Sequence, residues 1–158
     1  MLPLKWHAYA LANKLKRKRK KLVTAESCTG GMLATLLTSF SGSSNYFDSA
    51  FVTYSNNAKE KLLAVDPKIL KTYGAVSEET AKAMSKGALK ARNADLAVSI
   101  TGIAGPKSDS TKKPVGLVYI SLATKDSYFV KEFRFKGRRN KIRKLSCLNA
   151  MKIIASYL

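Results

Sequence analysis

Two candidate nucleophiles stand next to each other near the start of the chain. Ser27 and Cys28 belong to the run Thr24-Ala-Glu-Ser-Cys-Thr-Gly-Gly31, which follows the apolar pair Leu22-Val23 and precedes an apolar helix pattern from Met32 to Leu37. A strand, a glycine-rich turn and a helix in this order place the first helix amides where they can meet an anion. The run therefore predicts a chemical site at which a ligand approaches the backbone closely.

The same run is also compatible with an ordinary strand-to-helix turn, in which the hydroxyl of Ser27 or Thr29 caps the helix. Cys28 has two interpretations as well. A thiol at a helix start is acidified and reactive, which makes Cys28 a rival nucleophile, whereas a small free cysteine also suits a tight turn without doing chemistry. The turn by itself leaves these alternatives open.

A serine nucleophile needs a base, and the chain offers one histidine, His7, on the first expected helix with no second catalytic group near it in sequence. The base of Ser27 must then be a lysine or a carboxylate. A neutral lysine amine can take the serine proton if burial or nearby positive charge lowers its pKa from about 10.4. Lys59 is the best placed, on a short helix after Tyr54-Ser-Asn56, although a lysine there can equally be a solvated surface residue.

The elements that position these residues alternate between helix and strand, with short connections and no internal repeat. Helical spacing predicts a first amphipathic helix closed by the basic residues 18–21. Helices alternating with strands, and one late hairpin, predict an α/β fold: a three-layer α/β/α sandwich on a mixed β-sheet. The remaining expected elements are strands at 50–54, 96–100, 115–123 and 128–135, helices over about 56–63, 77–92 and 140–157, and a turn at Asp66-Pro67.

Length and composition set the broad class. With 158 residues, of which 46% are hydrophobic, the chain can bury a core as one domain over residues 1–158. It has no apolar stretch near the roughly 20 residues that span a bilayer and no secretion signal, so we expect a cytoplasmic protein without a membrane partner. Two cysteines and one histidine provide no metal-binding cluster, so no metal and no cofactor are expected.

Charge is the other unusual property. The chain has 29 basic and 10 acidic residues, a formal net charge of +19, which attracts polyanions. The densest basic runs are 14–21 and 131–144, while other lysines scatter over the middle of the chain. Nucleic-acid binding and a generally lysine-rich, solvated surface both remain possible, and no single basic stripe stands out.

Five blocks of the sequence follow one another in a distinctive order: Thr24 to Gly31, Phe51 to Asn56 with Ala58-Lys59, Gly74 to Glu78, Ser99 to Pro106 and Lys113 to Gly116. In order and spacing they resemble the CinA C-terminal domain family, over roughly Lys5 to Tyr157. Because the chain begins directly on this domain, it looks like the family's stand-alone form, a nicotinamide-nucleotide amidohydrolase. The resemblance implies hydrolysis of nicotinamide mononucleotide to nicotinate mononucleotide and ammonia, in pyridine-nucleotide recycling, by a chain that commonly dimerises.

The family's catalytic positions fall on Ser27, Lys59 and Thr101 of this chain. We expect Ser27 to attack the carboxamide, neutral Lys59 to move the proton, and Thr101 to hydrogen-bond one of them. Backbone amides of 28–31 or 101–102 would hold the oxyanion. The expected substrate contacts are Glu26, Cys28, Thr29, Gly30, Gly31, Tyr54, Asn56, Gly102, Arg139 and Arg143, the two arginines or helix-start amides taking the phosphate.

Two departures from the family's pattern lie near this expected site. Residues 107–112 replace a glycine-rich stretch, and Gly137-Arg138-Arg139 has a base where the family has Gly-Asp-Arg. Three classes of function therefore stand side by side: the amidohydrolase, a basic nucleic-acid-associated protein of the competence or DNA-damage type, and a nucleotide-binding remnant without turnover.

Overall fold

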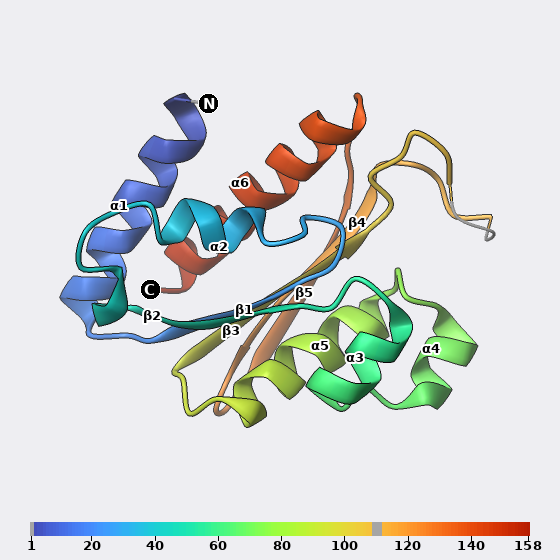
Figure 1. Ribbon diagram of the computed structural model, residues 1–158, viewed down its shortest axis with the longest axis horizontal. Helices are drawn as coiled ribbons and strands as arrows, with labels where there is room; N and C mark the ends of the chain where they lie inside the picture. Colours follow the sequence, from blue (N-terminus) through green and yellow to red (C-terminus); the bar gives the residue numbers. More distant parts are fainter. Residues whose placement is uncertain (1, 109–111) are drawn as a thin grey trace.

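The computed structural model describes residues 2–108 and 112–158, with side chains from Leu4 onward. A five-stranded sheet lies between two layers of helices (Figure 1). The elements in chain order are α1 (Leu2–Lys18), β1 (Leu22–Glu26), α2 (Met32–Leu37), the 3-10 turn η1 (Ser43–Asn45), β2 (Phe47–Val52), α3 (Asn56–Leu63), α4 (Pro67–Tyr73), α5 (Glu78–Ala91), β3 (Leu96–Gly102), β4 (Leu117–Thr124), β5 (Tyr128–Arg134) and α6 (Arg139–Tyr157).

The sheet is mixed, with strand order β2-β1-β3-β4-β5. β1 pairs in parallel with both β2 and β3, so that Thr24 lies between Ala50 and Val98. β3, β4 and β5 are antiparallel to one another, as expected for a late hairpin. Every residue of β1 is buried because helices cover both faces of the central strand, whereas β2 at the sheet edge alternates between half-buried and exposed. The predicted three-layer sandwich on a mixed sheet is confirmed.

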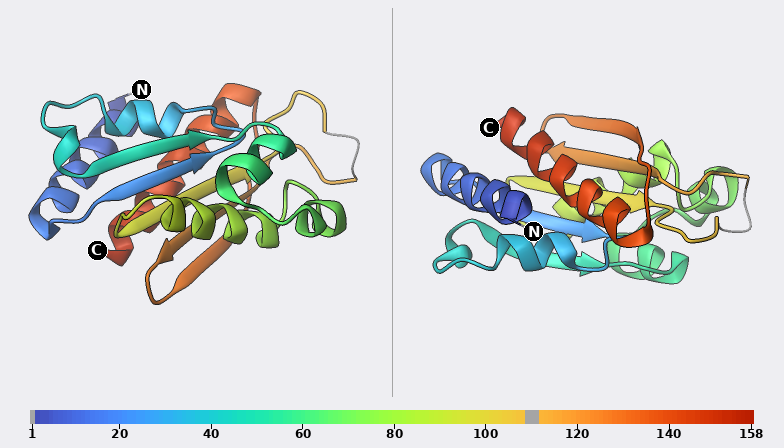
Figure 2. Two further views of the ribbon diagram at one scale, coloured as in Figure 1. Left: turned by 60° about the horizontal axis from the view of Figure 1, so that its bottom comes forward. Right: turned by 90° about the horizontal axis from the view of Figure 1, so that it is seen from above.

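Helices α1, α2 and α6 cover one face of the sheet, and α3, α4 and α5 cover the other (Figure 2). On the first face, Leu15 of α1 and Ile154 of α6 are fully buried with the strand residue Ile100. On the second, Met84 of α5 packs with Leu63 of α3. Each such side chain contributes about 2 kcal/mol by burial, and together they fix both helical layers on the sheet.

The connections open a crevice at one end of the parallel strands. From β1 the chain enters α2 on one face, and from β2 it enters α3 on the other. Because these strands run parallel, their carboxyl ends lie at the same edge of the sheet. In open α/β sheets, ligands bind in the crevice outside the strand ends at such a switch point.

Three expected boundaries were wrong. β1 extends to Glu26, three residues into the run that was expected to form the turn, and the second strand is Phe47–Val52 rather than 50–54, which leaves Tyr54 in a loop. A short helix, α4, follows Asp66, where only a turn was expected; Asp66 accepts from the Lys68 amide and Pro67 begins the helix. One buried residue, Leu70, is too few to give a helical period in the sequence.

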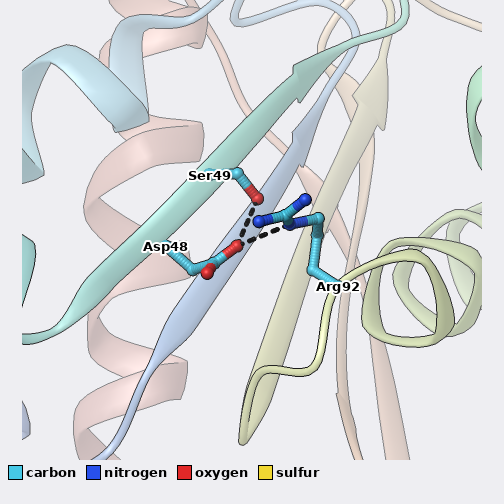
Figure 3. Close-up of polar contacts among 3 residues, drawn as sticks. All are labelled: Asp48, Ser49 and Arg92. Atoms are coloured by element: carbon cyan, nitrogen blue, oxygen red, sulfur yellow. Dashed lines mark hydrogen bonds and ion pairs between the residues drawn. The ribbon is translucent and has the colours of Figure 1, made fainter.

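An ion pair fastens the edge strand β2 to the segment between α5 and β3 (Figure 3). Arg92 Nε donates to Asp48 Oδ2 at 2.8 Å, and Ser49 Oγ donates to the same oxygen at 2.7 Å. Both bonds lower the pKa of the Asp48 carboxyl, and the bond from Arg92 has the larger effect. Since the pair is partly solvated, its contribution to stability is at most about 1 kcal/mol.

Candidate functional site

The loops after β1, β2 and β3 meet at the carboxyl ends of these strands. Ser27 directly follows β1, and its amide donates to the Ile100 carbonyl of β3 at 2.9 Å, which continues the parallel ladder by one residue. The Ser27 carbonyl accepts from the Gly30 amide at 3.0 Å, which closes a tight turn. Two backbone bonds therefore fix where the Ser27 hydroxyl points.

Lys59 lies against Ser27, with its Nζ 3.1 Å from Ser27 Oγ. Ser55 caps α3 by accepting from the Ala58 amide, which places Lys59 in the first turn of the helix. Helical side chains lean toward the helix N-terminus, so that of Lys59 reaches back to the strand ends. Its amine also contacts the carbonyl oxygens of Thr53, at 2.9 Å, and Tyr54, at 3.5 Å. The predicted pair of nucleophile and base is thus within hydrogen-bond distance.

The Lys59 amine is removed from water, since only 1% of the residue is exposed. Burial lowers the pKa of Lys59 from 10.5 to about 8 because a charged ammonium is poorly solvated there. Within the described part of the chain no carboxylate forms an ion pair with it. The amine is consequently neutral in a large fraction of molecules at mildly alkaline pH.

Cys28 has the opposite character. Burial raises the pKa of its thiol from 9.0 to about 12, an effect larger than the opposing influence of its own backbone, Arg143 and Lys59. A neutral thiol is a weak nucleophile. The environment therefore favours Ser27 over Cys28, and Cys28 lines the cavity as a small apolar residue.

The start of α2 is already occupied by a side chain of the protein. Glu26 is fully buried, and its carboxylate accepts from the amides of Gly31, Leu33 and Ala34 at 2.9–3.1 Å. The expectation that an anionic ligand meets these amides was wrong, because an internal carboxylate meets them instead. Glu26 thus holds the helix to the strand end rather than contacting substrate, and neither Ser27 nor Thr29 is the N-cap, which is Gly31.

Arg143 of α6 holds the same turn from outside. Its Nε donates to the Cys28 carbonyl at 3.1 Å and its Nη2 to the Thr29 carbonyl at 2.9 Å. Arg143 does not line the cavity with Ser27, so its expected role as a phosphate ligand stays a prediction, and in this geometry its guanidinium supports the turn. Gly30 and Gly31 have φ of +56° and +90°, which favours glycine at both positions in the turn.

A cavity of about 260 Å³ opens above Ser27 and Lys59. Its size suits a small ligand. Seven predicted site residues line it: Ser27, Cys28, Tyr54, Lys59, Thr101, Gly102 and Arg139. The other six predicted residues, Glu26, Thr29, Gly30, Gly31, Asn56 and Arg143, are not part of its lining.

The missed lining residues come from two segments. Ala75 and Val76 precede α5, and Ile103, Ala104 and Gly105 follow β3, with Lys107 and Ser108 beyond them. The residues at 75–76 and 103–105 have no reactive side chain, so only their place in two of the family's blocks could have indicated them. Lys107 and Ser108 lie beyond the last of these two blocks. Residues 109–111, in the expected departure over 107–112, lie outside the described residues.

Thr101 joins these segments. Its hydroxyl donates to the Ala75 carbonyl at 2.6 Å, not to Lys59 or Ser27, so the expected bond to the catalytic pair is not formed. The bond holds the segment before α5 against the end of β3. Thr101 is fully buried and shapes the cavity wall.

Arg139 and Tyr54 form the rim of the cavity. Arg139 Nη1 donates to the Gly105 carbonyl at 2.7 Å, and its Nη2 donates to the Tyr54 hydroxyl at 2.8 Å. Lys107 is exposed and lines the same cavity. The cavity therefore has two exposed cationic side chains at its mouth and the buried Ser27 at its base.

His7 is far from this chemistry in the structure. It lies half-buried on α1, its ring 5.1 Å from that of Trp6, and does not line the cavity. Among the residues that are described, no group of three or more His, Cys, Asp or Glu side chains is arranged to hold a metal ion. None of the described helices is both long and apolar enough to cross a bilayer.

Comparison with known proteins agrees with this architecture. Residues 5–158 match the model of the CinA C-terminal domain. A CinA-like protein from Geobacter sp. (strain M21) is 47% identical over 148 residues, which are 94% of this chain and 36% of the relative. The chain therefore spans about a third of the length of this relative.

Solved structures share the whole fold. The competence/damage inducible protein CihA from Agrobacterium tumefaciens superposes with a TM-score of 0.93 at 38% identity, over 97% of this chain and 94% of that one. A competence-damaged protein (CinA) superfamily protein from Escherichia coli gives a TM-score of 0.94 at 32% identity, over 98% and 90% of the two chains. These names describe family and induction, and no reaction.

Proposed function

This chain belongs to the CinA C-terminal domain family, and we propose that it hydrolyses the carboxamide of nicotinamide mononucleotide to nicotinate mononucleotide and ammonia. The substrate is the one that the resemblance to this family implies. The observation that carries the proposal is the 3.1 Å contact between Lys59 Nζ and Ser27 Oγ at the base of a ligand-sized cavity. A buried amine next to a hydroxyl is the arrangement that activates a serine without histidine.

The surroundings of Lys59 suit a proton acceptor. A neutral amine has two hydrogens and one lone pair, and the carbonyl oxygens of Thr53 and Tyr54 accept the hydrogens. The lone pair is then directed at the Ser27 hydroxyl. The same carbonyls stabilise the ammonium that forms when the proton arrives, so both states of Lys59 have partners.

The reaction proceeds in two steps. Ser27 Oγ attacks the carboxamide carbon while its proton passes to Lys59, and the tetrahedral intermediate collapses as Lys59 returns that proton to the departing ammonia. A water molecule then attacks the ester, with Lys59 taking its proton and giving it back to Ser27. The products are nicotinate mononucleotide, ammonia and the free enzyme.

Two backbone amides support an oxyanion site. The Cys28 amide lies in the turn directly after the nucleophile. The Gly102 amide points to the Ser27 side of β3, because neighbouring amides of a strand alternate and that of Ile103 donates to Leu117 on β4. No described carbonyl of the turn accepts from either amide. One such donor to a developing oxyanion is typically worth about 3 kcal/mol in the transition state.

The rim supports recognition of a phosphate. Arg139 has a planar guanidinium held by Gly105 and Tyr54, and Lys107 adds a second positive charge. The bonds to Gly105 and Tyr54 use two of the five guanidinium N–H groups, and the other three can donate to phosphate oxygens. With the carboxamide at Ser27, the phosphate would lie toward the mouth.

Release of ammonia from nicotinamide mononucleotide tests the proposal. We expect turnover by the wild-type protein, and none by Ser27→Ala or Lys59→Ala, both with unchanged far-ultraviolet circular dichroism. Ser39→Ala is a matched control, because Ser39 is exposed on the loop after α2 and does not line the cavity. Nicotinamide riboside, which lacks the phosphate, should be a much poorer substrate.

Full activity in either cavity variant would remove that residue from the mechanism. If the wild-type protein showed no turnover while the mononucleotide still raised its melting temperature, the chain would be a binding protein that has lost catalysis. No turnover and no thermal shift would refute the substrate assignment altogether.

A further inference from the structure

Acidic residues are absent from one of the two helical layers. Of the ten acidic residues in the sequence, none lies in 1–25, in 27–47 or in 133–158, and these segments contain α1, α2 and α6. Ten basic residues lie on the two longer helices of this layer: Lys5, Lys14, Lys16, Arg17 and Lys18 on α1, and Arg139, Lys141, Arg143, Lys144 and Lys152 on α6.

The opposite layer is mixed in charge. Its three helices carry seven lysines together with three acids, Glu60 on α3 and Glu78 and Glu79 on α5. The positive charge is therefore not spread evenly, as scattered lysines in the sequence suggested. The outer surface of α1 and α6, here called the α1–α6 face, carries eight of the ten basic residues of these two helices and no acid, because Arg139 and Arg143 turn to the cavity rim and to the nucleophile turn. These helices lie side by side on the same side of the sheet (Figure 2), and Lys14 Nζ donates to the Ala155 carbonyl at 2.6 Å.

The α1–α6 face also carries exposed aromatic rings. Trp6 is 66% exposed and Tyr9 is 54% exposed, one turn apart on α1. The ring of Tyr9 lies edge-on to that of Phe40, with 5.4 Å between the centroids. Trp6 is not needed for the core, because α1 packs on the sheet through other residues, including Leu4, Leu11 and Leu15, which are buried. Packing does not explain why the large Trp6 ring is exposed to water. Its helix, α1, carries basic residues and no acidic residue.

We propose that the α1–α6 face binds single-stranded nucleic acid, with phosphates on its lysines and arginines and an unpaired base stacked on Trp6. Positive grooves combined with aromatic platforms bind single strands without sequence preference, since every base has a π-face. A duplex keeps its bases stacked internally and offers none to Trp6. A membrane surface is disfavoured because helices that lie on bilayers insert an apolar face, and that of α1 is buried against the sheet.

The chain contains its own probe, since Trp6 is its only tryptophan. Addition of a 20-residue oligothymidylate should quench the tryptophan fluorescence as the base stacks. Inorganic polyphosphate, which has charge but no bases, should bind without comparable quenching. A 20-base-pair duplex should also quench less than the single strand.

Charge removal locates the binding surface. The triple variant Arg17→Gln, Lys18→Gln, Lys152→Gln changes three exposed residues of the face whose side chains form no ion pair among the described residues. With about 0.7 counterions released per phosphate contact, its log-affinity against log-salt slope should fall by about 2, and its affinity by up to about 100-fold at 0.1 M salt.

The matched control removes the same charge from the other layer. Lys61→Gln, Lys68→Gln, Lys71→Gln changes three exposed lysines of α3 and α4 and should leave the slope nearly unchanged. Trp6→Ala should weaken binding of the oligothymidylate about 10-fold, and Trp6→Phe, which keeps a stacking ring, should restore most of the loss, as measured by anisotropy of a labelled strand.

Four results would overturn the proposal. Equal losses in the two triple variants would mean attraction by net charge alone, and equal quenching by polyphosphate would mean no stacking. A blue shift of Trp6 with phosphatidylglycerol vesicles, at affinity above that for the oligonucleotide, would indicate a lipid surface. Protection of Trp6 from acrylamide in the free protein would indicate that another copy covers the face. Trp6→Ala should retain ammonia release, so this proposal and the amidohydrolase fail separately.

Discussion

Replacing Lys59 by methionine should abolish activity and yet change stability in a way that depends on pH. Folding lowers the pKa of Lys59 from 10.5 to about 8. Below pH 8 both folded and unfolded chains hold the proton, and the folded state bears the full cost of a buried charge, about 3 kcal/mol for this shift. Methionine has a similar length and no charge, so Lys59→Met should be more stable than wild type at pH 7 by up to that amount, less about 1 kcal/mol for lost hydrogen bonds.

The sign of the pH dependence follows from proton binding. Between pH 8 and 10.5 the unfolded chain retains a proton on Lys59 that the folded chain has released, so the free energy of unfolding of the wild type rises with pH. The rise amounts to about 2 kcal/mol between pH 7 and 9.5 for these two pKa values. Lys59→Met lacks this contribution, and its advantage over wild type should shrink by the same amount.

Urea unfolding of both proteins at pH 7, 8, 9 and 9.5 measures the difference. Other groups titrate in both proteins and cancel when the two curves are subtracted. Lys61→Met, two residues along α3 and exposed, is the matched control and should show a difference that does not vary with pH. If the curves of wild type and Lys59→Met stayed parallel over this range, Lys59 would not have a depressed pKa and the assignment of a neutral base would fail. In the same range, kcat should rise with pH and level off above about 8, since only the neutral amine accepts the proton.

Four further substitutions probe the turn and the rim. Cys28→Ala should keep most of the ammonia release, because burial holds the pKa of Cys28 at about 12 and leaves no thiolate to lose; loss of activity with an unchanged fold would restore the thiol as a candidate. Glu26→Ala should lower the free energy of unfolding by about 2–4 kcal/mol in urea titration, since three amides at the start of α2 lose their acceptor. Arg139→Met should raise KM for the mononucleotide about 10-fold with little change in kcat and none for the riboside; a fall in kcat alone would argue against phosphate binding. Arg138→Asp should raise the melting temperature, because position 138 has N-cap geometry without a side-chain bond and aspartate there contributes about 1 kcal/mol.

Much of the fold was visible in the sequence because its signals are local. Ser77 before Glu78 and Glu79 marks a helix start, and Ser77 does cap α5 by accepting from the Thr80 amide. Apolar spacing on α6 likewise predicted its extent within one residue. Elements with one buried side chain, such as α4, or with alternating exposure at a sheet edge, such as β2, carry weaker periods and were placed wrongly.

The site was predictable to the extent that its residues are chemically distinctive. Ser27 and Lys59 lie 32 positions apart, and only the parallel pairing of β1 with β2 brings their loops together. Roles that depend on the orientation of a side chain were not predictable. The Glu26 carboxylate accepts from amides at the start of α2, and the Arg143 guanidinium donates to backbone carbonyls. A sequence gives the chemical groups of such residues, but their partners are decided by the tertiary fold.

The internal carboxylate at α2 has a consequence for substrate selection. An external phosphate at that helix start would have to displace Glu26, and a buried carboxylate without its three amide donors is costly. The turn after β1 therefore holds the nucleophile and does not bind the substrate's phosphate. Arg139 and Lys107 at the rim of the cavity are the residues that can recognise an anionic substrate. A charge at the rim can be changed without disturbing the backbone that fixes Ser27. Differences in substrate among proteins of this fold should accordingly follow substitutions at the rim rather than in the turn.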